Sequence, residues 1–428
     1  MKSNKFDKTQ KSLFSVHLLR VVLELFTSTF LTSHIVSLNP ETALGAGLLN
    51  IGIFYISQFF IYGVLFFVIS FFVDRSDRIS LLRIGIFVNA CLLVALVFWG
   101  EQIANWVVLA GALCGISDAF YYPSYLVMKN EINSRRFIKK FSILSTIFTN
   151  VVKVVVPVIL GFLIDVSSYS NIAIYIMLIT IVQFIVTFWV KTKKPDNSKF
   201  ELKKFIRYLK RDDFARSKIK YTYYNALLNG PKNTYNMIVV VLTIYTFKTN
   251  LSLGLFTSIF SFVTMALLLL FKKIDGNQKI NKFYIYLAIG VLPVVSCIVL
   301  VFWLNKPTII VYNFFLTVAL YFSDYFGTTE RDTIIRSLDK KEFIAEHQLM
   351  VETCQNVSKV FSYLLFVIVG LIANLTVFKI LLIILILICP VKFLVMFKQR
   401  QIRKEFEKAQ QEAQDAKEKE LETLNANS

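Results

Sequence analysis

The feature that most constrains this chain is a series of long apolar segments, separated by short stretches rich in Lys and Arg. A helix that crosses the ~30 Å hydrocarbon core of a bilayer needs about 20 mostly apolar residues. Segments of this kind lie at residues 12–38, 47–72, 80–99, 105–128, 142–164, 171–190, 220–246, 251–271, 283–303, 308–329, 348–373 and 380–397. The 41 phenylalanines are also more than one soluble core of this size could bury. The sequence therefore predicts an all-α integral membrane protein with twelve transmembrane helices.

Positive charge is confined almost entirely to alternate loops. Of the 47 Lys and Arg residues, five fall inside the expected spans, and Lys248, Lys306 and Lys379 lie in the loops on one face. The remaining 39 lie in the two tails and in the loops on the other face, with Arg83 and Lys220 counted at the span ends that adjoin those loops. Because cytosolic loops accumulate Lys and Arg, we expect both termini in the cytosol. The net charge of +19 then needs no nucleic-acid partner, and the Lys-, Ile-, Asn- and Phe-rich composition favours a bacterial plasma membrane.

A single offset of 206 residues aligns the two halves of the chain. It places Asp118 over Asp324 and Lys153 over Lys359. Parallel repeats of six helices are known in transporters, so two pseudo-symmetric six-helix bundles are expected. The predicted domains are an N-terminal bundle at 1–190, a basic cytosolic loop at 191–219, a C-terminal bundle at 220–397 and a charged cytosolic tail at 398–428. Part of the loop, residues 201–214, is predicted to form an amphipathic helix on the membrane surface.

Ionisable residues inside the predicted spans cost about 3 kcal/mol each and usually face a cavity or a partner, and seven of them are candidates for a role in transport. They are Arg20, Glu24, Asp118, Lys153, Lys232, Asp324 and Lys359. Arg20 and Glu24 are four residues apart on one helical face and can pair directly. This pair is a candidate proton or substrate site, with a structural bridge between helices as the alternative. Lys392 is set aside because it lies near the inner end of the last segment, where its long side chain can reach the interface.

The repeat also predicts two Asp–Lys pairs. The turn between Asp118 and Lys153 lies midway along the chain, so two antiparallel helices would bring both residues to similar depth. The same arithmetic predicts an Asp324–Lys359 pair in the second half. An aspartate beside a lysine could exchange a proton as the helices move, since burial and a neighbouring charge control such titrations. Buried bridges that make each half rigid remain the alternative.

The segment 220–246 is polar and interrupted. It contains Asn229, Lys232 and Asn233 around a Gly230–Pro231 step, which breaks a helix and frees backbone groups. Such interruptions indicate a binding site in transporters, although a structural kink would have the same sequence. Aromatic residues at helical spacings could stack on an apolar substrate or serve in packing; they are Tyr55, Phe59, Tyr62, Tyr121, Tyr122 and Tyr125.

The loop after the second segment carries a short motif. Residues 70–83 read SFFVDRSDRISLLR, in which Asp74 and Arg75 are followed by the basic residue Arg78. This resembles the Gly-x-x-x-Asp-Arg-x-Gly-x-Arg signature of the major facilitator superfamily, with Ser70 and Asp77 in place of the glycines. The resemblance, which covers nearly the whole chain, implies the twelve-helix fold of that family. It also implies that Asp74, Arg75 and Arg78 form a cytosolic gate.

Two further stretches are similar to exporters of that superfamily. The run GISDAFYYPS resembles the Gly-x-x-x-Ala-Phe-x-x-Pro stretch of bacterial macrolide-type and siderophore-type exporters through Gly115, Ala119, Phe120 and Pro123. The run NVVKVVVPVILG keeps only one proline and one glycine of the antiporter motif in the fifth helix. The resemblance implies secondary active transport by alternating access, with proton-coupled efflux of a small amphiphilic drug or metabolite.

Other functions are either excluded or left open. The sequence lacks HExxH, GxSxG, P-loop and Cys/His cluster motifs, so we expect no enzyme, no metal and no cofactor, and an ion gradient, with protons as the favoured ion, as the energy source. The expected partners are a small-molecule substrate and the lipid bilayer, and the expected state is a monomer. The alternatives are uptake or exchange of an anionic solute, flipping of a lipid-linked precursor, and a non-transporting membrane scaffold or sensor.

Overall fold

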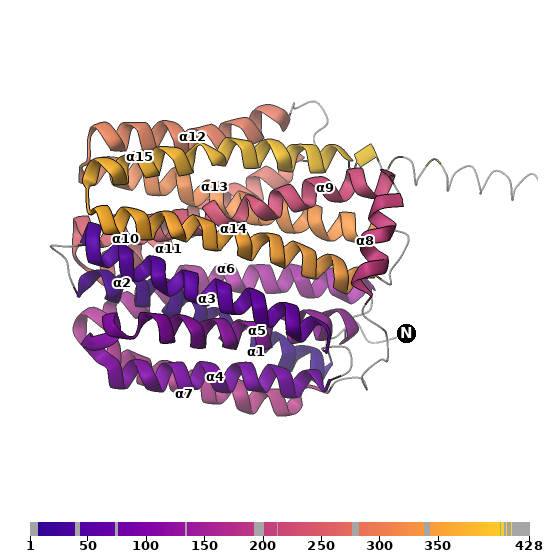
Figure 1. Cartoon of the computed structure of the whole chain (residues 1–428), viewed down its shortest axis with the longest axis horizontal. Helices are drawn as coiled ribbons and strands as arrows, with labels where there is room; N and C mark the ends of the chain where they lie inside the picture. Colours follow the sequence, from indigo (N-terminus) through magenta and orange to yellow (C-terminus); the bar gives the residue numbers. More distant parts are fainter. Residues whose placement is uncertain are drawn as a thin grey trace, which may run out of the picture.

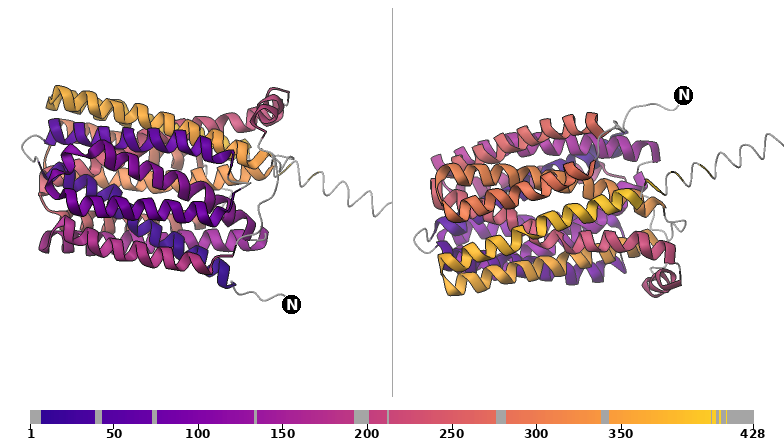
Figure 2. Two further views of the ribbon diagram at one scale, coloured as in Figure 1. Left: turned by 60° about the horizontal axis from the view of Figure 1, so that its bottom comes forward. Right: turned by 90° about the horizontal axis from the view of Figure 1, so that it is seen from above.

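The computed structural model describes residues 7–38, 43–72, 76–132, 135–191, 201–211, 213–275, 282–337 and 343–402, with four more between 404 and 412. Within these residues, twelve helical segments lie side by side with their long axes roughly parallel (Figure 1, Figure 2). The first six are formed by α1 (Lys8–Leu25) with α2 (Leu31–Ser37), α3 (Leu48–Ser70), α4 (Arg78–Trp99), α5 (Val107–Ile132), α6 (Arg135–Val166) and α7 (Tyr169–Val186). The last six are formed by α9 (Asp213–Leu227) with α10 (Asn229–Phe247), α11 (Asn250–Asp275), α12 (Lys282–Phe302), α13 (Lys306–Ser337), α14 (Ile344–Ile372) and α15 (Leu375–Ile386).

The helices agree with the twelve predicted spans. Ten segments of the described chain are long and apolar enough to cross a bilayer, and the last of them extends from α15 to Ile402. The remaining two helical segments, α5 in the first half and α9–α10 in the second, carry more polar residues but run alongside the other helices. The described chain starts and finishes at the same end of the bundle (Figure 1), as an even number of crossings requires. The predicted fold class is therefore confirmed: an all-α membrane protein of two six-helix bundles.

Two long helix pairs join the two halves of the chain. The helix α3 packs along α14, and α6 packs along α11. A Cβ atom on Gly161 of α6 would collide with the carbonyl oxygen of Asn250, and one on Gly254 of α11 would collide with that of Pro157. Small residues allow helix backbones to approach this closely in a membrane, where apolar contact alone gives little preference for a neighbouring helix over lipid. The glycines thus set how tightly α6 and α11 fit.

Polar contacts close the bundle at the end opposite the chain termini. The Asp165 carboxylate accepts hydrogen bonds from the backbone N–H groups of Asn250 (3.0 Å) and Leu251 (2.8 Å). These groups form the first turn of α11, whose N–H groups lack acceptors within the helix. The Asn250 side chain also accepts a 2.5 Å hydrogen bond from the Ser33 hydroxyl of α2. Residues of the first half therefore hold the start of a helix of the second half.

The loop between the halves contains α8 (Leu202–Arg211), which crosses the end of the bundle near α14 (Figure 1). The Phe205 side chain of this helix is fully buried, and the centroids of the Phe205 and Phe343 rings are 5.5 Å apart. Tyr208 stacks on the same Phe343 ring at 5.7 Å. The backbone N–H of Glu201 donates a 2.7 Å hydrogen bond to the Glu346 carboxylate. The predicted amphipathic helix exists, and its buried aromatic face contacts protein at the start of α14.

Replacing Phe205 with alanine should release α8 from α14. Loss of a buried Phe costs about 3–5 kcal/mol, which exceeds what one short helix gains elsewhere. Trypsin cleavage after Lys203 and Lys204 should therefore speed up at least tenfold, because local opening exposes these bonds. The matched control is Ile206→Ala, since Ile206 lies on the exposed side of the same helix. Equal cleavage rates in both variants would show that the Phe205 contact does not hold α8.

Candidate functional site

A cavity of ≈ 500 Å³ lies between the two halves of the bundle. Residues of α1, α3 and α5 line it from the first half, and residues of α10, α13 and α14 line it from the second. Its polar lining comprises Arg20, Glu24, Thr27, Ser28, Gln58, Asp118, Asn233, Asp324, Glu352 and Lys359. Charged side chains in a membrane protein are costly unless they pair or face water. Their concentration at one interface marks this cavity as the candidate site.

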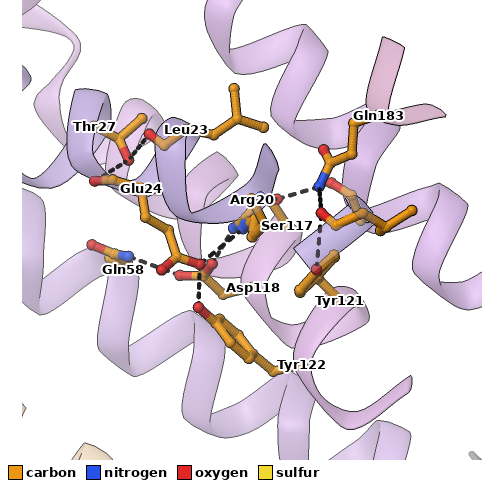
Figure 3. A network of polar contacts seen from close by, with 12 residues as sticks. Arg20, Leu23, Glu24, Thr27, Gln58, Ser117, Asp118, Tyr121, Tyr122 and Gln183 are labelled. Atoms are coloured by element: carbon orange, nitrogen blue, oxygen red, sulfur yellow. Dashed lines mark hydrogen bonds and ion pairs between the residues drawn. The ribbon is translucent and has the colours of Figure 1, made fainter. Parts of the chain in front are cut away.

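Arg20 is the centre of the polar network on the first half (Figure 3). Its guanidinium is 2% exposed and donates to Glu24 (Nε to Oε1, 3.2 Å), to Ser117 (Nη1 to Oγ, 3.1 Å) and to Asp118 through Nη2. The Gln58 amide donates a 2.9 Å hydrogen bond to the other Asp118 oxygen. A buried ion is tolerated only when such partners offset its lost hydration. The structure thus contains the predicted Arg20–Glu24 pair and extends it to α5.

Glu24 faces the cavity more openly than its partners. Its side chain is 36% exposed, compared with 12% for Asp118. The Tyr122 hydroxyl donates a hydrogen bond to the same Glu24 oxygen that Arg20 contacts. Both carboxylate oxygens of Asp118 already accept hydrogen bonds, one from the Arg20 guanidinium and the other from the Gln58 amide. Of the two carboxylates, Glu24 is therefore the more accessible to solvent and protons.

The first helix changes its winding beside the cavity. Between α1 and α2, residues Phe26–Phe30 form a π-helical turn. Such turns insert an extra residue into a helix and are frequent at functional sites. Two of its residues, Thr27 and Ser28, line the cavity, and Tyr55 donates a 3.1 Å hydrogen bond to the Ser28 carbonyl oxygen. The π-helical turn therefore presents polar groups of the first helix to the cavity.

A second charge pair lies across the cavity. Lys232 of α10 forms a salt bridge with Asp324 of α13. The helix is interrupted at Leu228, just before the Gly230–Pro231 step, so the predicted break in this segment is confirmed. Pro231 occupies the first turn of α10, where its missing N–H removes no helical hydrogen bond. The interruption separates α9 from the polar first turns of α10.

This pair borders a side pocket of ≈ 170 Å³. Asn233, Asp324 and Lys359 line both the side pocket and the central cavity. The rest of the polar lining consists of Thr222, Asn225, Asn229, Lys232, Ser323 and Gln355. The candidate residues predicted in the segment 220–246 therefore do face a cavity. The pocket extends the candidate site into the second half.

The two predicted Asp–Lys pairs are wrong. Asp118 pairs with Arg20 rather than Lys153, and the Lys153 ammonium lies 5.4 Å from the Tyr321 ring centroid. Lys359 lies 4.4 Å from the Phe59 ring centroid instead of pairing with Asp324. Counting residues from a turn predicts depth along two helices, but contact also requires that both side chains point at each other. The actual partners come from the first helix of each half, so the symmetry holds for helices and fails for residues.

Two charged residues were missed or misjudged by sequence reasoning. Glu352 of α14 lines the cavity, and its carboxylate accepts hydrogen bonds from Gln348 (3.1 Å) and Tyr62 (3.4 Å). It lies within a predicted span, so the same scan for intramembrane charge could have found it. Lys392 is 3% exposed and donates a hydrogen bond to Asn229, which contradicts the prediction that it reaches the interface. Both residues belong to the charge balance of the site.

The predicted gate motif is only partly visible. Asp74 and Arg75 lie outside the described residues. Arg78 begins α4 and is buried. The nearby Arg83 donates a 2.9 Å hydrogen bond to the Thr187 hydroxyl and lies 4.3 Å from the Phe188 ring centroid. The cytosolic gate therefore stays a prediction.

The aromatic residues divide into two groups. Tyr55, Phe59 and Tyr62 of α3 and Tyr122 of α5 line the central cavity. Tyr121 and Tyr125 pack in the core of the first half. The Tyr55 ring stacks directly on Tyr363 of α14, with ring centroids 4.6 Å apart, and both rings line the cavity. The cavity therefore has an aromatic wall beside its charged one. Among the described residues, no cluster of His, Cys, Asp and Glu could hold a metal ion.

Two helical bundles around a charged central cavity are an architecture that secondary transporters share. The chain belongs to the major facilitator superfamily, whose sequence profile matches residues 21–333. This match confirms the predicted family. No curated protein matches the sequence.

Solved structures show the same fold. A POT family transporter in complex with 5-aminolevulinic acid is 12% identical, with a TM-score of 0.66 over 90% of this chain and 96% of that one. A peptide transporter POT in complex with alafosfalin is 12% identical, with a TM-score of 0.64 over 93% of this chain and 99% of that one. A bacterial homologue of the human lysosomal transporter Spinster, inward-facing and unoccupied, is 10% identical, with a TM-score of 0.56 over 92% and 98%.

Proposed function

We propose that this protein is a proton-coupled transporter that works by alternating access and exports a small amphiphilic molecule. The observation that carries the proposal is the ≈ 500 Å³ cavity between the halves, lined by Arg20, Glu24 and Asp118 on one side and by Asp324 and Lys359 on the other. A membrane scaffold needs no such cavity and would gain stability from an apolar core there. The combination of charged and aromatic walls suits an amphiphile.

Glu24 is the proposed proton carrier. Its carboxylate is exposed to the cavity and shares Arg20 with Asp118. When Glu24 takes up a proton, Arg20 loses one of its two acidic partners and the charge of the cavity rises by one. A carboxylate between a cation and a hydroxyl donor can change its proton affinity when either neighbour moves. Rocking of the two halves would supply that movement.

Export from a bacterial cytosol is the proposed direction and place. The exporter-like run around Gly115 and Pro123 supports efflux, and the tally of Lys and Arg supports cytosolic termini in a plasma membrane. Uptake or exchange of an anionic solute is the second candidate. It is favoured by the cations Lys232, Lys359 and Lys392, which gather on one side of the cavity region.

Proteoliposomes with an imposed pH gradient test the proposal. A panel of drugs, peptides, sugars and organic anions should contain compounds whose flux the gradient drives. Glu24→Gln should reduce gradient-driven flux at least tenfold and spare substrate counterflow, because glutamine binds substrate donors but cannot carry a proton. The matched control is Glu101→Gln, an exposed residue in the loop before α5. Undiminished gradient-driven flux in Glu24→Gln would refute Glu24 as the carrier, and absence of any flux by the unaltered protein across the panel would refute the proposed transport.

A further inference from the structure

The side pocket of the second half collects polar groups that have no partner within the described chain. Ser323 is 5% exposed, and its hydroxyl lacks a hydrogen-bond partner within the described chain. The partly buried amides of Asn233 and Gln355 also make no hydrogen bond to another described residue, and the buried side-chain oxygen of Asn225 accepts none. Native proteins satisfy the large majority of buried polar groups. Unpaired polar groups that converge on one pocket therefore indicate a polar ligand, and the charged side chains beside them decide which charge it carries.

The charge of the pocket is positive. Lys232 and Lys359 line it together with one carboxylate, that of Asp324, which Lys232 neutralises. The Lys359 ammonium contacts the face of the Phe59 ring at 4.4 Å and forms no salt bridge within the described residues. The Lys392 ammonium donates a hydrogen bond to the side-chain amide oxygen of Asn229. Asn229 is thereby oriented with its oxygen toward Lys392, so its amide N–H₂ group remains available on another side.

The acidic groups lie mainly elsewhere. Glu24 and Asp118 are on α1 and α5 of the first half, and Glu352 is held by Tyr62 and Gln348. The side pocket therefore carries a net positive charge, whereas the central cavity outside it, lined by Arg20, Glu24, Asp118 and Glu352, forms an acidic side beside the aromatic wall of Tyr55. A uniformly polar cavity would not select the orientation of a substrate, whereas this separation does.

We propose that the side pocket is an anion subsite that binds a carboxylate or phosphate group of the substrate, with Lys359 as its specificity-determining cation. The apolar body of the substrate lies in the central cavity against the aromatic wall. This inference rests on the proposed transport function and deepens it, because it assigns the substrate to amphiphilic anions. Lys359 and Asn233 line both spaces, so they stand where the charged end of the substrate meets its body.

Thiol labelling measures the charge of the pocket without any knowledge of the substrate. The variant Gln355→Cys, made with Cys354→Ser to remove the neighbouring thiol, is labelled with an anionic sulfonatoethyl and a cationic trimethylammonioethyl methanethiosulfonate. The anionic reagent should be favoured about tenfold relative to a free thiol, because it is attracted by Lys359 across a medium of low polarity. Adding Lys359→Gln should abolish this preference. Thr27→Cys on the acidic side is the matched comparison and should favour the cationic reagent.

A protection arm identifies the anion. Labelling of Gln355→Cys is repeated with 4-phenylbutyrate, phenyl phosphate or the neutral 4-phenylbutyramide. Slower labelling with the carboxylate or with the phosphate than with the amide supports the proposal and names the preferred group. Equal rates with all three, or an anionic preference that survives Lys359→Gln, would overturn it. Because labelling requires no transport, this failure is distinct from a failure of gradient-driven flux.

Discussion

Replacing Asp118 with alanine should destabilise the protein and abolish transport. The change removes one of the two carboxylates that offset the buried Arg20 guanidinium and leaves the Gln58 amide without its acceptor. Loss of one partner from a buried ion pair costs about 3–5 kcal/mol, because the other charge stays buried without compensation. Thermal unfolding in detergent should show a markedly lower midpoint, and flux in proteoliposomes should fall to the level of empty vesicles.

A double variant separates stability from function. In Arg20→Met/Asp118→Leu, both members of the buried ion pair are replaced by apolar side chains of similar size, which is often neutral or stabilising. Glu24 loses Arg20 but keeps the Tyr122 hydroxyl and its 36% exposure to the cavity, so its charge is not left fully buried. Its unfolding midpoint should return to near that of the unaltered protein, while transport should stay absent. If the single variant Asp118→Ala unfolds at the unaltered temperature, the Arg20 network does not stabilise the fold as proposed. If the double variant transports substrate, the network has no role in transport.

A disulfide between Gly45→Cys and Ala373→Cys should stop transport reversibly. A Cβ atom built on Gly45 lies 3.1 Å from that of Ala373, a little below the roughly 3.5–4.5 Å of a disulfide, so a small outward shift of the backbone allows the bond. Gly45 precedes α3 in the first half, and Ala373 follows α14 in the second. The bond would lock the two halves together at the end opposite the chain termini. Alternating access requires this end to open, so oxidised protein should lose at least nine-tenths of its flux.

Reduction provides the control for that experiment. Dithiothreitol should restore flux to the level of the reduced double variant, since the cysteines themselves leave the cavity unchanged. Each single cysteine variant should be indifferent to oxidant. Full flux in a protein shown by its gel mobility to be crosslinked would contradict alternating access through separation of the halves at this end.

The sequence alone predicted the elements that depend on composition along the chain. Apolar length and the alternation of Lys and Arg predicted the twelve helices, because the bilayer imposes the same requirement on every span. The i, i+4 spacing of Arg20 and Glu24 predicted their contact, since both residues share one helix and its geometry is invariant. The Gly230–Pro231 step likewise predicted the interruption before α10.

Only the tertiary structure decided which helix faces meet. Asp118 pairs with Arg20 and Asp324 pairs with Lys232, although the repeat favoured Lys153 and Lys359 as partners. The rotation of each helix about its own axis determines such pairs, and it depends on how all neighbouring side chains pack together. That rotation also directed Lys392 inward to Asn229. The sequence by itself thus determined where charge enters the membrane, and packing decided what each charge touches there.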